Sequence, residues 1–148
     1  MQIIFVSDHA GFSLKGVLVA YVRDELGYEV EDVGAHTLDP EDDYNSFVSV
    51  AAKKVAGNPE GARAIILGGS GQGEAIQANR FKGVRAAVFY GGALDIVSLS
   101  REHNDANVLS LGARFVDEKV AKEAVKLWLA VKKNTDEKYA RRIHAMDA

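Results

Sequence analysis

Short apolar segments alternate with helical patterns from one end of this chain to the other, and this alternation constrains the fold more than any other feature. Residues 3–6 and 64–67 are continuously apolar, which is typical of strands buried on both faces. Residues 28–33 alternate polar and apolar side chains and predict a half-exposed edge strand, and residues 84–90 and 108–111 supply two further strands. Because helical patterns separate these strands, we expect a parallel, doubly wound α/β sheet.

Helical spacing of apolar side chains marks the segments between the strands. The predicted helices cover residues 14–22, 44–55, 74–80, 93–102 and 120–131. A charged helix at about residues 136–146 closes the chain. A length of 148 residues, with no linker rich in Pro, Gly or Ser, predicts one domain over residues 1–148.

The composition argues against several classes of partner and site. The 18 Lys and Arg residues against 21 Asp and Glu give a formal charge of −3, so we expect no nucleic-acid partner. Cysteine is absent, which excludes disulfides, cysteine-ligated metals and a thiol nucleophile. The apolar runs are too short for a membrane span and the N-terminus soon turns polar, so we predict no membrane partner, no signal peptide and a cytoplasmic location.

A glycine-rich loop directly follows the third predicted strand. Residues 68–73 read Gly-Gly-Ser-Gly-Gln-Gly, and glycines in such a place let backbone N–H groups turn inward to form an anion-binding nest. A tight strand-to-helix turn is the simpler alternative, although one or two glycines would suffice for it. The loop fits neither a P-loop nor a dinucleotide fingerprint, because Glu74 stands where each motif requires another residue. We therefore expect no nucleotide cofactor.

Glu74 follows the glycine loop and calls for an explanation of its own. A carboxylate there could simply favour the helix N-terminus through the macrodipole. It could also abstract a proton while the loop stabilises the oxyanion formed beside it. From the residues alone these two interpretations carry equal weight.

Other polar residues occupy positions where ligands bind in sheets of this kind, beyond the carboxyl ends of the strands. Asp8 and His9 follow the first strand, as either a helix-capping turn or part of a site. His103 ends a helix, as either a general acid or a partner of the helix dipole. Four basic residues in the C-terminal part of the sequence form either a solvated face or a binding site for a phosphorylated small molecule. They are Arg114, Lys138, Arg141 and Arg142.

Metal-ligand spacing is missing from the sequence. His36 and His144 stand apart from other candidate ligands, and no H-x-x-x-H pattern or carboxylate cluster occurs. We therefore predict no metal site.

Three segments together resemble a known family. Residues 7–12 (Ser-Asp-His-Ala-Gly-Phe), 69–73 (Gly-Ser-Gly-Gln-Gly) and 100–108 (Ser-Arg-Glu-His-Asn-Asp-Ala-Asn-Val) are similar, in order along essentially the whole chain, to the ribose-5-phosphate isomerase B family. Its wider membership includes galactose-6-phosphate and allose-6-phosphate isomerases. The resemblance implies a Rossmann-like, three-layer fold with five strands. It also implies an aldose–ketose isomerase, without metal or cofactor, that interconverts ribose 5-phosphate and ribulose 5-phosphate through an enediolate.

The resemblance also implies roles for individual residues and an assembly of subunits. It implies a homodimer or homotetramer with active sites at the subunit interface, and a C-terminal helix that packs on the partner. Glu74 is then the base, His103 the acid that opens the sugar ring, and Ser70 a further catalytic residue. The implied substrate-binding residues are Asp8, His9, Tyr44, Gly69, Ser70, Gly71, Gln72, Gly73 and Asn104, and the implied phosphate-binding residues are Arg114, Lys138 and Arg142.

The sequence departs from the family pattern at three places. Many relatives carry a Cys base at the position of Gly68, whereas this chain matches a branch with a Glu base in the next helix turn. An Arg-His pair near the C-terminus reads Lys138-Tyr139, and the residue after Tyr44 is Asn45 instead of Pro. These last two differences leave open a six-carbon sugar phosphate as substrate. A non-catalytic sugar-phosphate-binding protein is the alternative outside enzymology.

Overall fold

The apolar runs form one parallel sheet in the computed structural model, which describes residues 1–148. The sheet has five strands in the order β2-β1-β3-β5-β4. Their bounds are Gln2–Ser7 (β1), Glu29–Asp32 (β2), Ala62–Gly68 (β3), Ala86–Phe89 (β4) and Val108–Gly112 (β5). Every neighbouring pair is parallel, so the predicted doubly wound α/β fold class is confirmed.

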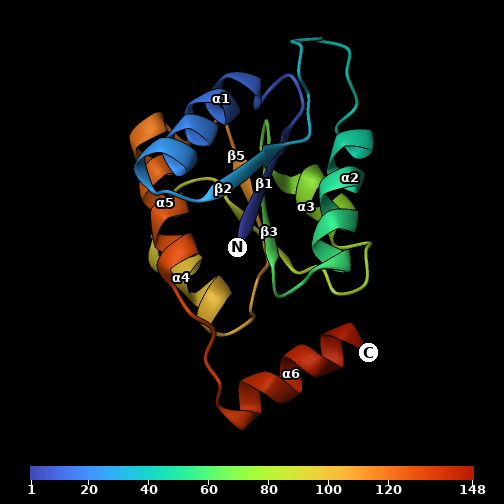
Figure 1. Cartoon of the computed structure of the whole chain (residues 1–148), viewed down its shortest axis with the longest axis vertical. Helices are drawn as coiled ribbons and strands as arrows, with labels where there is room; N and C mark the ends of the chain where they lie inside the picture. The colour runs from blue at the N-terminus through green and yellow to red at the C-terminus, as the bar shows by residue number, and fades with distance from the viewer.

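Helices cover both faces of the sheet and make it the middle of three layers (Figure 1). One layer contains α1 (Phe12–Ala20) with its π-helical continuation η1 (Tyr21–Glu25), α4 (Asp95–Glu102) and α5 (Glu118–Ala130). The other contains α2 (Tyr44–Gly57) and α3 (Gln72–Ala78). Covering both faces explains why the central strands are continuously apolar instead of alternating.

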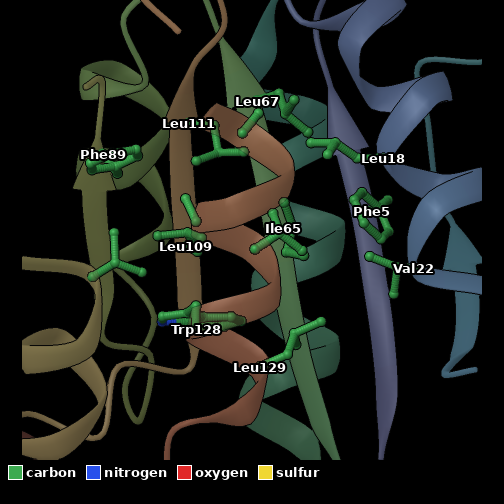
Figure 2. Close-up of a cluster of buried hydrophobic side chains, with 14 of the residues drawn as sticks. Phe5, Leu18, Val22, Ile65, Leu67, Phe89, Leu109, Leu111, Trp128 and Leu129 are labelled. Atoms are coloured by element: carbon green, nitrogen blue, oxygen red, sulfur yellow. The ribbon is translucent and has the colours of Figure 1, made fainter. Parts of the chain in front are cut away.

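Two apolar clusters hold the layers together, and successive residues of a strand belong to different clusters. Ile3 and Phe5 join a cluster of 16 buried residues beneath α1, α4 and α5, with the fully buried Trp128 among them (Figure 2). Ile4 and Val6 join a second cluster of 12 beneath α2 and α3. The edge strand β2 is only half-buried, as its alternating pattern predicts.

Several predicted boundaries differ from the structure; for example, the helices predicted at residues 93–102 and 120–131 begin at Asp95 and Glu118. The helix predicted at residues 74–80 begins two residues earlier, at Gln72, because Gly71 takes a left-handed conformation with φ of 75° and ends the loop there. The first helix also continues beyond residue 22, as the π-helical turn η1. Glu74 consequently lies in the first turn of α3, where it directly adjoins the glycine loop.

The last helix, α6 (Glu137–Asp147), lies apart from the three layers, at the end of the molecule where the strands begin (Figure 1). None of its residues is buried in the single chain. Asn134, just before α6, donates its backbone N–H to the carbonyl of Glu102 at 2.9 Å, and Asp147 near its other end pairs with Arg85. No helix of the molecule has the length and apolar character needed to cross a membrane.

Candidate active site

Three chain segments meet at the carboxyl edge of the sheet, because they follow three neighbouring strands. Asp8 and His9 follow β1, the glycine loop follows β3, and Arg114 follows β5. The chain after β1 runs outward to β2, whereas β3 pairs on the other side of β1, so the β1–β3 boundary is a topological switch point. Open α/β sheets bind their ligands in the crevice at such a point.

The glycine loop is held tightly against the end of β5. The buried hydroxyl of Ser110 donates to the carbonyl of Gly71 at 2.7 Å, and the backbone N–H of Ala113 donates to the carbonyl of Gly68 at 2.8 Å. A Cβ on Gly71 would lie 3.0 Å from the backbone carbon of Leu111. The loop therefore has little room to move, which preorganises its amides for an oxyanion.

Glu74 points back from α3 onto the glycine loop. Only 4% of the residue is exposed, and its carboxyl group fills the space that a side chain on Gly68 would need. Glycine at position 68 is therefore a steric condition for this placement of Glu74. The site has room for a functional side chain at position 68 or for the Glu74 carboxyl group, and this chain has the latter.

The surroundings of Glu74 favour its protonated form. Burial raises the pKa of the Glu74 carboxyl group above its usual value, and the negative charge of Asp8 raises it further, while the backbone amide of Glu74 acts in the opposite direction. A carboxylate with a raised pKa binds a proton more strongly and is a better general base near neutral pH. The chemistry open to Glu74 is thus proton abstraction beside a set of amide donors.

Asp8 has a structural task at this edge as well. Its Oδ1 accepts the backbone N–H groups of Ala10 at 2.9 Å and of Gly11 at 3.2 Å, in the turn that leads into α1. Asp8 therefore stabilises the turn before α1 but does not cap the helix, because no side chain caps the N-terminus of α1. Since Asp8 also bears on the pKa of Glu74, it takes part in the electrostatics of the site.

Asp42 belongs to the site, and sequence reasoning missed it. Its Oδ1 accepts the backbone N–H of His9 at 3.0 Å and lies 2.6 Å from Nδ1 of the same residue. The hydrogen bond to Asp42, together with the charges of Asp8 and Asp42, raises the pKa of His9, against opposing effects of partial burial and Arg114. The one signal in the sequence is the acidic run at residues 41–43, in the loop that leads from β2 to α2.

The group Asp8, His9 and Asp42 is also the one arrangement in the molecule whose donor atoms could surround a cation. Their candidate ligand atoms all lie within 4.8 Å of one another. However, Asp42 holds Nδ1 of His9, Asp8 accepts two backbone amides, and the raised pKa of His9 favours an imidazolium that cannot bind a metal. These groups are therefore engaged in hydrogen bonds within the protein. The absence of a resident metal stays a prediction.

Arg114 and Tyr44 reach the glycine loop from two sides. The backbone N–H of Arg114 donates to the carbonyl of Gly69 at 3.1 Å, and its Nη1 lies 3.2 Å from the position of a Cβ on Gly69. The hydroxyl of Tyr44, at the start of α2, lies 2.6 Å from the position of a Cβ on Gly73. Gly69 thus leaves room for the Arg114 side chain and Gly73 for the Tyr44 side chain, and a larger residue at either position would displace its neighbour.

Ser70 and Gln72 lie within the same loop. The hydroxyl oxygen of Ser70 accepts the backbone N–H of Gln72 at 3.3 Å, and the Gln72 side chain begins α3 on the exposed side. The structure therefore brings together the predicted residues that belong to the carboxyl edge. They are Asp8, His9, Tyr44, Gly69, Ser70, Gly71, Gln72, Gly73, Glu74 and Arg114.

Four predicted site residues lie at the far end of the molecule, where the strands begin. His103 and Asn104 precede β5, whereas Arg114 follows it, and the five residues of β5 span about 16 Å at roughly 3.3 Å per residue. Lys138 and Arg142 are on α6, beside that same far end (Figure 1). The single chain thus separates the predicted acid His103 from the predicted base Glu74. A hollow of about 420 Å³ also lies at the far end, lined by Arg85, Asn104 and Asp147 among others.

Known proteins of one family are similar to this chain over most of its length. A model of the Ribose/Galactose Isomerase family matches residues 3–146. Ribose-5-phosphate isomerase B of Escherichia coli is 41% identical over 128 residues, which cover 86% of this chain and 83% of that protein. The enzyme of the same name from Mycolicibacterium paratuberculosis is 39% identical over 114 residues, which cover 77% of this chain and 69% of that protein.

A solved structure extends the likeness to the fold. The crystal structure of ribose-5-phosphate isomerase B from Mycoplasma genitalium, with bound ribulose-5-phosphate, superimposes with a TM-score of 0.92 at 32% sequence identity. The match covers 99% of this chain and 93% of that one. The Rossmann-like topology expected from the sequence is therefore shared over nearly the whole length.

Proposed function

The chain belongs to the ribose/galactose isomerase family, and we propose that it is an aldose–ketose isomerase that interconverts ribose 5-phosphate and ribulose 5-phosphate. One observation carries this proposal: Glu74 is buried against the glycine loop, with its pKa raised. The names of the relatives and the ribulose-5-phosphate bound in the Mycoplasma genitalium structure support this choice of substrate. No contact in the structure favours a six-carbon sugar phosphate over the pentose.

In the proposed mechanism Glu74 moves one proton between two neighbouring carbons. The Glu74 carboxylate removes the proton from C2 of open-chain ribose 5-phosphate, and the electron pair moves to the C1 carbonyl oxygen, giving an enediolate. The amides of residues 69–73, with the Ser70 hydroxyl among them, stabilise the negative charge that develops on the oxygens. Glu74 then returns the proton to C1. The C2 hydroxyl passes its proton to the C1 oxygen, so that the C2 oxygen becomes the carbonyl of the ketose and the C1 oxygen becomes a hydroxyl.

The remaining residues of the carboxyl edge hold the substrate in this proposal. Asp8 and His9 bind the sugar, and Asp42 orients the His9 imidazole and raises its pKa. Tyr44 closes the sugar site at Gly73, and Arg114 offers its guanidinium to the phosphate. No metal or other cofactor is needed for this chemistry, because the glycine loop supplies the stabilisation of the oxyanion.

A second copy of the chain completes the site in the proposed assembly. His103 opens the sugar ring, Asn104 holds a sugar oxygen, and Lys138 and Arg142 bind the phosphate, all from the neighbouring subunit. This proposal is supported by the separation of these residues from Glu74 within one chain, and by α6, which buries no residue in its own chain. We therefore propose a cytoplasmic homodimer or homotetramer of single-domain subunits in which α6 packs on the partner.

Replacement of the base tests the proposed function. Glu74→Gln keeps the size of the side chain and removes its basicity, so we expect isomerase activity on ribose 5-phosphate to fall about 10²–10⁴-fold, the usual contribution of a general base. Binding of the sugar phosphate is expected to stay nearly intact, because the phosphate ligands lie elsewhere. Isomerase activity within about tenfold of the parent would rule out Glu74 as the base.

A further inference from the structure

The two histidines of the proposed site are held in different ways. His9 has a carboxylate partner, Asp42, at 2.6 Å from its Nδ1. The ring nitrogens of His103 have no hydrogen-bond partner in the chain; its backbone N–H continues α4 by donating to the carbonyl of Leu99 at 2.9 Å. The His103 imidazole contacts the ring of Tyr139, on α6. Their rings are stacked, with centroids 4.7 Å apart and planes inclined by 9°.

Tyr139 also lies next to a proposed phosphate ligand. The ammonium group of Lys138 lies 4.7 Å from the centroid of the Tyr139 ring, a distance typical of a cation–π interaction. Lys138, Tyr139 and Arg142 are all on α6, which is joined at its two ends by the Asn134–Glu102 hydrogen bond and the Arg85–Asp147 ion pair to the body of the chain. One helix therefore fixes both the His103 ring plane and the cations beside it.

We propose that Tyr139 is a positioning residue, which holds the His103 imidazole by stacking so that its free ring nitrogen reaches the ring oxygen of the sugar. The proposal rests on the proposed function and adds a residue that acts through His103. In the step it serves, protonated His103 gives a proton to the ring oxygen of the furanose, and the bond from that oxygen to C1 breaks. The C1 hydroxyl loses its proton to water and becomes the aldehyde carbonyl, and solvent then reprotonates His103.

A parallel stack suits this task, because it restrains the plane of the imidazole and leaves the ring nitrogens in that plane free. A hydrogen-bond partner such as Asp42 would occupy one of the nitrogens instead. Without the stack, the His103 ring rotates about its side-chain bonds, and misplacement of an acid by about 1 Å is enough to lower a rate by about 10²-fold.

The test uses two reactions of the same enzyme, of which only one needs ring opening. Ribose 5-phosphate closes to a furanose and must be opened, whereas ribulose 5-phosphate carries its phosphate on the oxygen that would close such a ring and stays open. Exchange of the C1 hydrogen of ribulose 5-phosphate with heavy water therefore needs Glu74 but not His103. We expect Tyr139→Leu to lower isomerisation of ribose 5-phosphate about 10- to 100-fold, and to leave C1 exchange at saturating ribulose 5-phosphate within about twofold of the parent.

Three further variants make the result specific to the stack. Tyr139→Phe keeps the ring and is expected to rescue most of the isomerisation rate. Lys138→Ala weakens phosphate binding, so it should raise KM in both reactions alike. Tyr21→Leu is the matched control, because Tyr21 is another half-buried tyrosine beside a lysine, Lys122, but lies on η1 away from His103.

Two outcomes would overturn the proposal. If Tyr139→Leu lowers both reactions by the same factor, the ring supports α6 or phosphate binding and has no separate effect on His103. If Tyr139→Leu lowers neither reaction, the stack has no part in catalysis. Failure of the proposed function would look different, since the parent protein itself would then give no C1 exchange with ribulose 5-phosphate.

Discussion

At the scale of the residue, the environment that suits Glu74 for catalysis works against the folded state. The pKa of Glu74 is raised in the native protein, chiefly by burial, so the native state holds this proton more tightly than the unfolded chain does. The native state therefore loses stability as pH rises through and above the ordinary glutamate value of 4.5. Stability and basicity are opposed at this one position.

This opposition predicts the effect of a neutral side chain on stability. Glu74→Gln removes the cost of a buried charge, so we expect a higher free energy of unfolding than the parent at neutral pH. The gain should disappear below pH 4.5, where Glu74 is protonated in both states. Urea unfolding of both proteins across this pH range measures the difference. A variant less stable than the parent at neutral pH would contradict the assigned cause.

A second prediction concerns the pair of His9 and Asp42. Asp42→Asn keeps an oxygen that accepts the His9 backbone N–H, but it removes the charge that stabilises the imidazolium. The pKa of His9 is raised in the parent chiefly through this partner, so the protonated form should be lost at a lower pH in the variant. The His9 ring protons report the titration by NMR. An unchanged midpoint would show that Asp42 does not control the charge of His9.

At the scale of the element, local patterns predicted the helices and strands well because periodicity is a local property. The continuous apolar run at residues 3–6 and the alternation at residues 28–33 are enough to distinguish a central strand from an edge strand. The start of α3 was wrong by two residues, since it depends on the left-handed Gly71 and its contact with β5. Asp42 was missed because it lies in an aperiodic loop and meets His9 across 33 residues of sequence.

The role of α6 could not be predicted from its own pattern either. Its charged sequence indicates a helix. Its position, however, depends on contacts made by Tyr139, Arg85 and Asn134, which no local sequence pattern predicts. The family resemblance suggested that this helix meets a partner subunit. In the structure α6 leaves all of its residues outside the core, which agrees with that expectation without testing it.

Removal of α6 gives a prediction at this scale. A chain without residues 136–148 keeps both apolar clusters, because neither contains a residue of α6. We expect it to fold, with a circular dichroism spectrum reduced only by the lost helix, and to have no isomerase activity because Lys138, Tyr139 and Arg142 are gone. Gel filtration should also show a smaller assembly than the parent. A truncated chain with full activity would contradict the place given to α6.

At the scale of the whole molecule, the predicted site residues of one chain are divided between the carboxyl edge and the amino edge of the sheet. The carboxyl edge holds Glu74, the glycine loop and Arg114, and the far end holds His103 and α6. The sequence identified both groups of residues but could not place them, since their separation depends on the direction of β5 in the sheet. The proposed site between two copies would join the groups without changing the fold.

A complementation experiment tests this arrangement. Glu74→Gln and His103→Ala are each expected to be inactive in isomerisation, but a mixed dimer contains one site with an intact Glu74 from one chain and an intact His103 from the other. Random pairing on co-expression makes half of the dimers mixed, so about one quarter of the parent activity should return in a symmetric dimer. If both residues acted within one chain, co-expression would restore nothing.

The central claim is that Glu74 moves a proton at C2 of the sugar phosphate, and hydrogen exchange tests it most directly. Ribose 5-phosphate is incubated with the protein in heavy water, and deuterium at C1 and C2 is followed by NMR. We predict that the parent incorporates deuterium at C1 of the ribulose 5-phosphate that forms and, through the reverse reaction, at C2 of ribose 5-phosphate, because the proton on Glu74 exchanges with solvent in the enediolate complex. Glu74→Gln is expected to bind the sugar phosphate but to incorporate none. Binding without exchange by the parent, or undiminished exchange by Glu74→Gln, would contradict the account.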